Sequence, residues 1–387
     1  MLILPIEVKN IKAEIEKINV HTGGKTIMLA KGEIIPLKLY AVRTPAANIL
    51  KQEMLAAGGE CVVHGDTITC KIEHSDILLL GTRKHYKILL HKLKFMNYFG
   101  LGRVAGAIAG YLQAGKYQTL LADGRNLQYK GSLIMGIINT TPDSFNASSR
   151  KLELEQVLQT VETMLQAGAV IIDIGGESTR PGAIPVEPEE ELRRVLPAIE
   201  AIKAAYGERV VISIDTYRAS TAKAALAAGA DIVNDVSACA DPKMLQVLLE
   251  SGAPIVLMHS EPLQTNDCVH EVAEFLYNKA QALEAAGISK EKIIIDIGIG
   301  FNKDQAQNIT LLKYLQSFQG LGYPVLLGAS RKRVVGGALD LPKAEDRLTG
   351  TLAITAHAQR SGTQIVRVHD VLENVQIIKM LEAIDNG

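Results

Sequence analysis

The sequence predicts an α/β protein, in which a small α/β domain at residues 1–128 precedes a (β/α)8 barrel at residues 131–387. Two observations favour this fold class. The chain has 387 residues, which is more than one hydrophobic core usually organises. After residue 133, short strand-like runs alternate with helical patterns eight times. These runs are almost continuously apolar, as in strands that a parallel sheet buries on both faces.

The eight predicted strands share a β-branched apolar body and a polar end. They lie at residues 133–139, 170–176, 210–216, 231–236, 254–259, 292–299, 324–330 and 364–370. The segments between them carry apolar residues at three- and four-residue spacing, which is typical of helices. Eight repeats in 257 residues match the usual size of a (β/α)8 barrel, whereas a doubly wound open sheet normally uses fewer strands.

The first part of the chain lacks this repeat. Its pattern predicts mixed strand character at 18–42, a helix at 45–58, a strand at 61–72, and a strand with one or two helices over 74–113. Residues 122–131 are predicted to be a linker. No catalytic motif occurs in this region, and its histidines show no spacing typical of a metal site. The sequence therefore assigns it no role.

The composition is that of an ordinary globular protein, with 47% hydrophobic and 21% charged residues. Four scattered cysteines form neither a metal-ligand pair nor a disulfide framework, which favours reduced thiols in the cytoplasm. Residues 1–130 contain 18 Lys and Arg but only 10 Asp and Glu, which leaves open a nucleic-acid or membrane-surface partner. The overall charge of −1 favours an ordinary solvated surface, with neither partner. No export signal or transmembrane helix is predicted.

Polar residues collect at the carboxyl ends of the predicted strands, where a barrel of this class forms the mouth of its active site. They are Asn139, Asp173, Asp215, Asn234, Asp235, His259, Asp296, Ser330, Lys332, Arg367 and His369. Such groups are costly inside a barrel unless they have partners. The acidic and amide groups come from the middle strands and can pair with the N–H edge of a polar heterocycle, while the later cationic groups can hold a phosphate. Two subsites are predicted.

Seven motifs then carry a specific resemblance. They are GIINTTPDSF (136–145), DIGGESTRPGA (173–183), SIDT (213–216), LMH (257–259), D-x-G-x-G-F-x-K (296–303), GASRK (328–332) and RVHD (367–370). In this order, over residues 131–387, they resemble dihydropteroate synthase. The resemblance implies a folate-biosynthesis transferase that condenses 6-hydroxymethyl-7,8-dihydropterin diphosphate with 4-aminobenzoate, giving 7,8-dihydropteroate and diphosphate. It also implies Mg2+ and a cytoplasmic homodimer that binds only small-molecule substrates.

The resemblance further implies a role for each matching residue. Those expected to bind the pterin are Asp215, Asn234, Asp296, Phe301 and Lys332. Those expected to bind the diphosphate are Asn139, which would also hold Mg2+, Thr179, Arg367 and His369. Those expected around 4-aminobenzoate are Ser144, Phe145, Thr179, Arg180, Pro181, Phe301 and Ser330. The catalytic set is Asp296, Lys332, Arg367 and His369.

Some positions also have a structural interpretation. Asp173 could pair with Arg180, and Asp235 could cap the next helix, so we expect both to be structural. His259 fits a core position and a site position equally well. The chain has Ser260 and Ile297 where the family usually has Met and Pro, and neither change removes a polar group named above.

Two other functions remain as alternatives. A corrinoid-linked methyltetrahydrofolate methyltransferase shares the barrel and the pterin-binding carboxylates, but it transfers a methyl group and needs no diphosphate site. The basic first region leaves room for a non-enzymatic regulator that binds pterin or nucleic acid. The Thr-Pro-Asp-Ser-Phe, Ser-Arg-Lys and Arg-Val-His segments favour the synthase over both.

Overall fold

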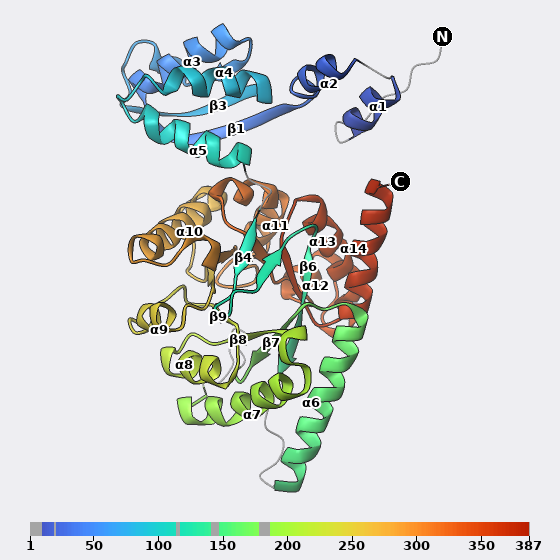
Figure 1. The fold of residues 1–387 in the computed structure, drawn as a ribbon. Helices are drawn as coiled ribbons and strands as arrows, with labels where there is room; N and C mark the ends of the chain where they lie inside the picture. The colour runs from blue at the N-terminus through green and yellow to red at the C-terminus, as the bar shows by residue number, and fades with distance from the viewer. Residues whose placement is uncertain (1–9, 19–20, 114–116, 141–146, 178–185, 387) are drawn as a thin grey trace. The chain divides into compact units, whose positions relative to one another are not determined.

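The computed structural model describes residues 10–18, 21–113, 117–140, 147–177 and 186–386. Backbone contacts divide the chain into two compact units, Met1–Gln113 and Ala114–Gly387. We call them the front unit and the barrel unit. Each has its own hydrophobic core, and Figure 1 shows their elements in chain order.

The barrel unit contains eight parallel strands that close on themselves, in the order β10-β11-β12-β13-β6-β7-β8-β9. Their bounds are β6 Leu133–Asn139, β7 Ile171–Gly175, β8 Val211–Asp215, β9 Ile232–Asp235, β10 Ile255–Met258, β11 Ile293–Asp296, β12 Val325–Leu327 and β13 Ile365–Val368. Each lies within one predicted run, so the predicted (β/α)8 barrel is confirmed. The register pairs Asp215 with Gly175 on one side and with Asn234 on the other, which brings the polar strand ends to one edge.

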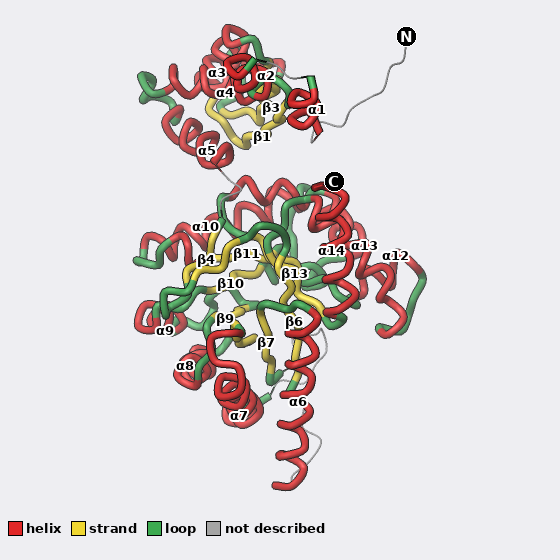
Figure 2. Tube along the Cα trace, turned by 45° about the vertical axis from the view of Figure 1, so that its right-hand side comes forward, coloured by secondary structure: helices red, strands yellow, loops and turns green. Residues whose placement is uncertain are grey.

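Helices surround these strands, as Figure 2 shows. They are α6 Ala147–Ala167, α7 Pro188–Tyr206, α8 Ala219–Ala228, α9 Met244–Ser251, α10 Cys268–Ala285, α11 Gln305–Lys313, α12 Arg333–Leu339, α13 Leu348–Arg360 and α14 Val371–Asn386. Short 3-10 helices lie at Gly207–Arg209, Lys290–Lys292, Leu315–Leu321 and Glu345–Arg347. Side-chain caps begin two of these helices: Asp267 accepts the His270 N–H before α10, and Asp304 accepts the Gln307 N–H before α11. None of the described helices is long and apolar enough to span a bilayer.

A β-hairpin closes the amino end of the barrel. It comprises β4 Gln118–Leu120 and β5 Asn126–Gln128, and its Leu121 and Leu127 pack in one apolar cluster with residues at the start of the barrel strands. Arg125 forms an ion pair with Asp231, at the amino end of β9. The predicted domain boundary at 128–131 and the predicted linker at 122–131 therefore differ from the structure, in which this segment belongs to the barrel unit.

The front unit is a three-stranded antiparallel sheet of order β1-β3-β2, and the helices α3 and α4 pack against its strands. Its elements are α1 Ile11–Lys17, α2 Thr22–Leu29, β1 Ile34–Arg43, α3 Thr44–Ala57, β2 Glu60–Val62, a 3-10 helix at Gly65–Thr67, β3 His74–Thr82, α4 Arg83–Leu93 and α5 Leu101–Gln113. The helix predicted at 45–58 is confirmed. Strand character predicted for 22–29 is wrong, because this segment forms α2. Of the strand predicted at 61–72, only the first two residues lie in β2, and the rest is a 3-10 helix, a turn and irregular chain.

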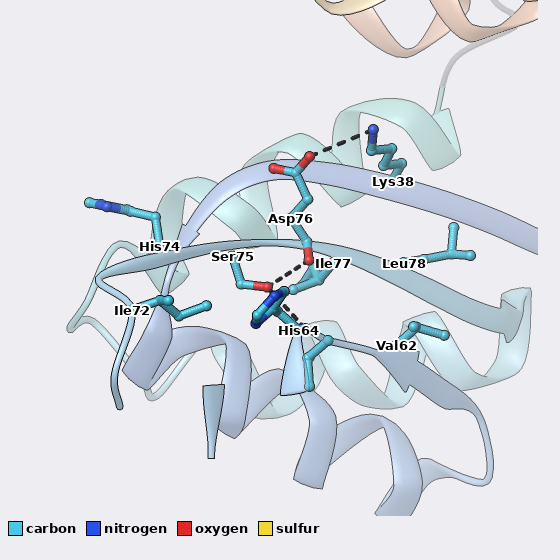
Figure 3. Close-up of a pocket in the computed structure, with 10 residues that line it drawn as sticks. Lys38, Val62, His64, Ile72, His74, Ser75, Asp76, Ile77 and Leu78 are labelled. Carbon is cyan, nitrogen blue, oxygen red and sulfur yellow. Dashed lines mark hydrogen bonds and ion pairs between the residues drawn. The ribbon is translucent and has the colours of Figure 1, made fainter. Parts of the chain in front are cut away.

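A cavity of about 700 Å³ lies on the sheet of the front unit (Figure 3). Its lining includes Lys38, Val62, His64, His74, Asp76 and Leu78. Its charged groups bind one another: Lys38 Nζ lies 3.6 Å from Asp76 Oδ2, and Asp76 Oδ1 accepts the Ala41 N–H at 3.0 Å. No residue that the sequence analysis assigned to a site lies here, so we place the chemistry in the barrel.

Candidate active site

Arg367, on β13, joins two buried carboxylates at the mouth of the barrel. Its Nε donates to Asp173 Oδ2 at 2.5 Å, and its Nη2 donates to Asp215 Oδ2 at 2.6 Å. Burial raises the pKa of Asp215, which Arg367 opposes and Asp173 reinforces. Burial alone would lower the pKa of Arg367, but the two carboxylates outweigh it and raise that pKa. Arg367 therefore stays charged and crosslinks β7, β8 and β13.

Asp173 also positions the amide from β9. Asn234 Nδ2 donates to Asp173 Oδ2 at 3.2 Å, so this carboxylate orients both Asn234 and Arg367. Within the described part of the chain, the second oxygens of Asp173 and Asp215 are buried and have no hydrogen-bond partner. Because buried acceptors normally find a donor, these oxygens favour a bound molecule or water that supplies N–H or O–H groups.

Asp296 and Lys332 form the neighbouring part of the site. Asp296 ends β11 and accepts the Gly298 N–H at 2.8 Å, while Lys332 Nζ donates to Ile299 O at 2.7 Å and lies 4.5 Å from the centre of the Phe301 ring. Burial raises the pKa of Asp296, against the attraction of Lys332. Burial lowers the pKa of Lys332 to about 8, although Asp296 favours its charged form. The structure thus brings together all the predicted pterin-binding residues.

The predicted anion-binding residues approach the same edge. His369 Nδ1 lies 3.0 Å from Ser330 Oγ, and the His369 backbone N–H donates to the same hydroxyl at 3.2 Å. Asn139 is exposed at the end of β6, and a Cβ at Gly175 would lie 3.8 Å from Asn139 Oδ1 and 3.6 Å from Asp215 Cβ. Because Gly175 has no side chain, a space remains between Asn139 and Asp215, and a larger residue at position 175 would fill part of it.

Five predicted residues of the 4-aminobenzoate site lie outside the described residues. They are Ser144, Phe145, Thr179, Arg180 and Pro181. The predicted pair of Asp173 with Arg180 therefore stays a prediction, and the partner that the structure gives Asp173 is Arg367.

The structure favours a structural role for Asp235 and a core position for His259. Asp235 accepts the backbone N–H groups of Ser237 and Cys239 at 2.8 Å each, so it holds the loop after β9. The sequence analysis had instead predicted that it caps the next helix, which is α9. The His259 ring is buried and packs edge-on against Phe275 at 4.8 Å. Burial lowers its pKa to about 4, which keeps the ring neutral at physiological pH.

The sequence analysis missed an ionic network beside this site. Arg218 Nη1 donates to Glu177 at 2.6 Å and to Glu191 at 2.7 Å, and its Nη2 donates to Val186 O at 2.7 Å. Glu191 is buried and also accepts from Thr221. These three partners of Arg218 lie 27 to 41 residues away in the sequence, so no local spacing in the sequence indicates the network.

Comparison with known proteins gives this geometry a family. The pterin binding enzyme family matches residues 135–369, which run from β6 to the end of β13. The dihydropteroate synthase of Bacillus subtilis is 46% identical over 263 residues, which cover 67% of this chain and 91% of that protein. The chain belongs to the dihydropteroate synthase family.

Solved dihydropteroate synthases agree with this membership. The Xanthomonas albilineans enzyme with 4-aminobenzoic acid aligns with a TM-score of 0.65 and 39% identity, covering 69% of this chain and 97% of that one. The Burkholderia cenocepacia enzyme complexed with 7,8-dihydropteroate aligns with a TM-score of 0.64 and 34% identity, covering 70% of this chain and 97% of that one.

One relative matches beyond the barrel. It is a probable bifunctional folylpolyglutamate synthase/dihydropteroate synthase of Haloferax volcanii, 37% identical over 359 residues. The match covers 88% of this chain and 42% of that protein. The aligned region is longer than the barrel unit, so it extends into the front unit.

Proposed function

We propose that the barrel catalyses the reaction of its family, in which 6-hydroxymethyl-7,8-dihydropterin diphosphate condenses with 4-aminobenzoate to give 7,8-dihydropteroate and diphosphate in folate biosynthesis. The observation that carries the proposal is the linked set of Asp173, Arg367, Asp215 and Asn234 beside Asp296 and Lys332 at the mouth of the barrel. The solved relatives with 4-aminobenzoic acid and with 7,8-dihydropteroate support both ends of this reaction.

The pterin fits the acidic part of this set. Asp215, Asn234 and Asp296 offer acceptors and one amide to the N–H edge of the ring, and Lys332 offers a donor. The unpartnered Asp215 oxygen supports such a bond, because a ring N–H would satisfy it. Phe301 would lie against the flat face of the ring system. Arg367 would keep Asp215 ionised and correctly aimed.

The diphosphate would bind to Asn139, Thr179, Arg367 and His369, and Mg2+ would bind with it at Asn139. The described residues hold no cluster of three His, Cys, Asp or Glu side chains that could bind a metal. An exposed amide oxygen fits Mg2+ nonetheless, because this ion keeps several waters and usually takes one or two protein oxygens plus substrate phosphates. When bound, Mg2+ would neutralise charge on the diphosphate.

The leaving group should depart before the amine attacks. Breaking the C–O bond leaves positive character on the pterin methylene, which the buried Asp296 carboxylate stabilises. Arg367 and His369 bind the departing diphosphate more tightly as its charge grows. The 4-aminobenzoate nitrogen then forms the new C–N bond and loses its proton to solvent. Ser330 and Phe301 would line the pocket that presents this amine, together with Phe145, Thr179, Arg180 and Pro181.

A cytoplasmic homodimer completes the proposal. The four cysteines are free thiols, which suits a reducing compartment. On α14, Leu372, Met380 and Ile384 are exposed at spacings that place them on one face of the helix. An apolar face of this kind supports a second copy as its partner.

The test is an assay of purified protein with both substrates and Mg2+, following dihydropteroate. We expect product from wild type only when both substrates are present, and a loss of roughly a hundredfold or more in Lys332→Ala, because a buried catalytic cation is removed. Lys343→Ala, at an exposed lysine, is the matched control. A folded protein that binds the pterin but makes no product would overturn the synthase and favour the methyltransferase.

A further inference from the structure

The loop between β11 and α11 winds around one ammonium group. Lys303 Nζ donates to His259 O at 2.9 Å, to Gly298 O at 3.0 Å and to Phe301 O at 3.1 Å. A lysine has three N–H donors, so this set uses all of them. Lys303 belongs to the D-x-G-x-G-F-x-K motif, yet neither the sequence analysis nor the proposed reaction gave it a role.

Close packing around Lys303 depends on a glycine. Gly298 has a φ of +68°, and a Cβ there would lie 1.9 Å from His259 O and 3.2 Å from Lys303 Nζ. A side chain would therefore collide with the carbonyl that binds the ammonium group. A second bond ties the same two loops together, because Asn302 Nδ2 donates to Ser260 O at 2.8 Å. The conformation of this loop is thus tightly specified.

The same loop sets three groups of the active site. The Gly298 N–H binds Asp296, Ile299 O accepts from Lys332, and the Phe301 ring lies next to the Lys332 ammonium group. Lys303 holds Gly298 O and Phe301 O, which flank Ile299 O along the chain. Two lysines thus bind successive parts of one loop, and only Lys332 is part of the predicted substrate site.

We propose that Lys303 is a positioning residue, whose ammonium group fixes residues 297–302 in the conformation that presents Gly298 N–H to Asp296, Ile299 O to Lys332 and the Phe301 ring to the pterin. This inference rests on the proposed function.

The charge of Lys303 also acts on its neighbours. The titratable groups that face it are Asp296 on β11, Cys268 on α10, His259 after β10 and Lys332 after β12. Burial lowers the pKa of Lys303 itself to about 8, against the attraction of Asp296. Its positive charge lowers the pKa of Asp296 and of Lys332. Removing the charge should therefore move both the acidic and the alkaline limb of activity to higher pH.

The experiment compares Lys303→Met, Lys303→Arg and the exposed-site control Lys343→Met. Methionine keeps length and packing but removes the donors and the charge. We expect Lys303→Met to fold, to lose roughly 10- to 100-fold in kcat/KM for the pterin diphosphate because three buried carbonyls lose their donor, and to shift both pH limbs upward. Lys303→Arg should keep the wild-type pH limbs and recover part of kcat/KM, while the control should match wild type.

Two results would overturn the inference. One is wild-type kcat/KM in folded Lys303→Met. The other is a loss of activity with unshifted pH limbs that simply follows a lower Tm. If Lys303→Met does not fold, Asn302→Gly carries the test, because it removes the second bond between the loops and glycine tolerates the φ of +44° at this exposed position. It should raise KM for the pterin, and a wild-type KM would refute the role of the loop. An inactive wild type would instead refute the proposed function.

Discussion

At the scale of single residues, one arginine serves two carboxylates. Arg367 contacts Asp173 and Asp215 in a site that excludes most solvent, so its single positive charge is divided between them. A buried cluster with surplus acidity is costly by itself. It becomes useful when a ligand brings N–H donors, because the free oxygen of Asp215 can then be satisfied. The site is therefore organised for a donor-rich ring.

Asp173→Asn tests this division of charge. The change preserves the shape of the side chain but removes one negative charge, so Asp215 becomes the only carboxylate of the two that still forms an ion pair with Arg367. Because Asp173 helps to raise the pKa of Asp215, its removal should lower that pKa and move the acidic limb of activity to lower pH. We expect kcat/KM for the pterin diphosphate to fall by roughly 10-fold or more, since Arg367 and Asn234 lose their common partner.

The control for this change is Asp340→Asn, at an exposed position with a φ of +56°, which asparagine tolerates well. It should match wild type in steady-state kinetics between pH 5 and 9 or so. An unaltered acidic limb in Asp173→Asn would show that Asp173 does not influence Asp215.

At the scale of elements, the barrel was predictable and the contacts across it were not. Each barrel strand is a buried β-branched run, and burial on both faces leaves a strong sequence pattern. The pair of Arg367 with Asp173 spans 194 residues, and barrel closure creates it by pairing β13 with β6, which in turn pairs with β7. Sequence spacing cannot encode such a pair, whereas Arg180, seven residues after Asp173, is a partner that the local sequence suggests.

The front unit was less predictable because the sequence patterns of some of its elements conflict with the structure that they form. The β-branched residues Thr26 and Ile27 favoured a strand, but Ile27 is exposed and α2 forms its hydrogen bonds locally. The hairpin before the barrel carried a usable signal in Asp123-Gly124, where Gly124 has a φ of +89°. We interpreted that signal as a linker.

Arg218, which follows β8, connects the segment after β7 to the helix α7, and this connection can be tested. It binds Glu177 and Val186, which flank residues 178–185 along the chain, and Glu191 on α7. Thr179, Arg180 and Pro181, expected at the 4-aminobenzoate site, lie within that segment. Arg218→Ala should therefore raise KM for 4-aminobenzoate by about 10-fold, because a buried acid loses its partner, with a smaller effect on KM for the pterin.

Steady-state kinetics with each substrate varied in turn would measure this difference. Arg193→Ala is a suitable control, since Arg193 is exposed on α7 and pairs with Glu190. Equal increases in both KM values would point to general damage and contradict a local effect.

At the scale of the whole molecule, the core clusters of the two units share no residue within the described part of the chain. The front core runs from Ile35 to Ile108, and the barrel cores contain residues from Leu121 onward. Separate cores permit separate cooperative unfolding. The boundary is the critical detail, because the hairpin at 118–128 belongs to the barrel.

Two truncated chains can therefore test whether the barrel begins at the observed boundary, residue 114, or at the predicted one, residue 131. A chain of residues 114–387 keeps the hairpin and should retain wild-type kcat and unfold in one transition. A chain of residues 131–387 loses Leu121, Leu127 and the Arg125–Asp231 ion pair, and so exposes the apolar amino end of the barrel. Its free energy of unfolding should fall by roughly 3–6 kcal/mol, from about 1.5–3 kcal/mol for each buried leucine. Urea unfolding measures this difference, and equal stability of the two chains would contradict the closing role of the hairpin.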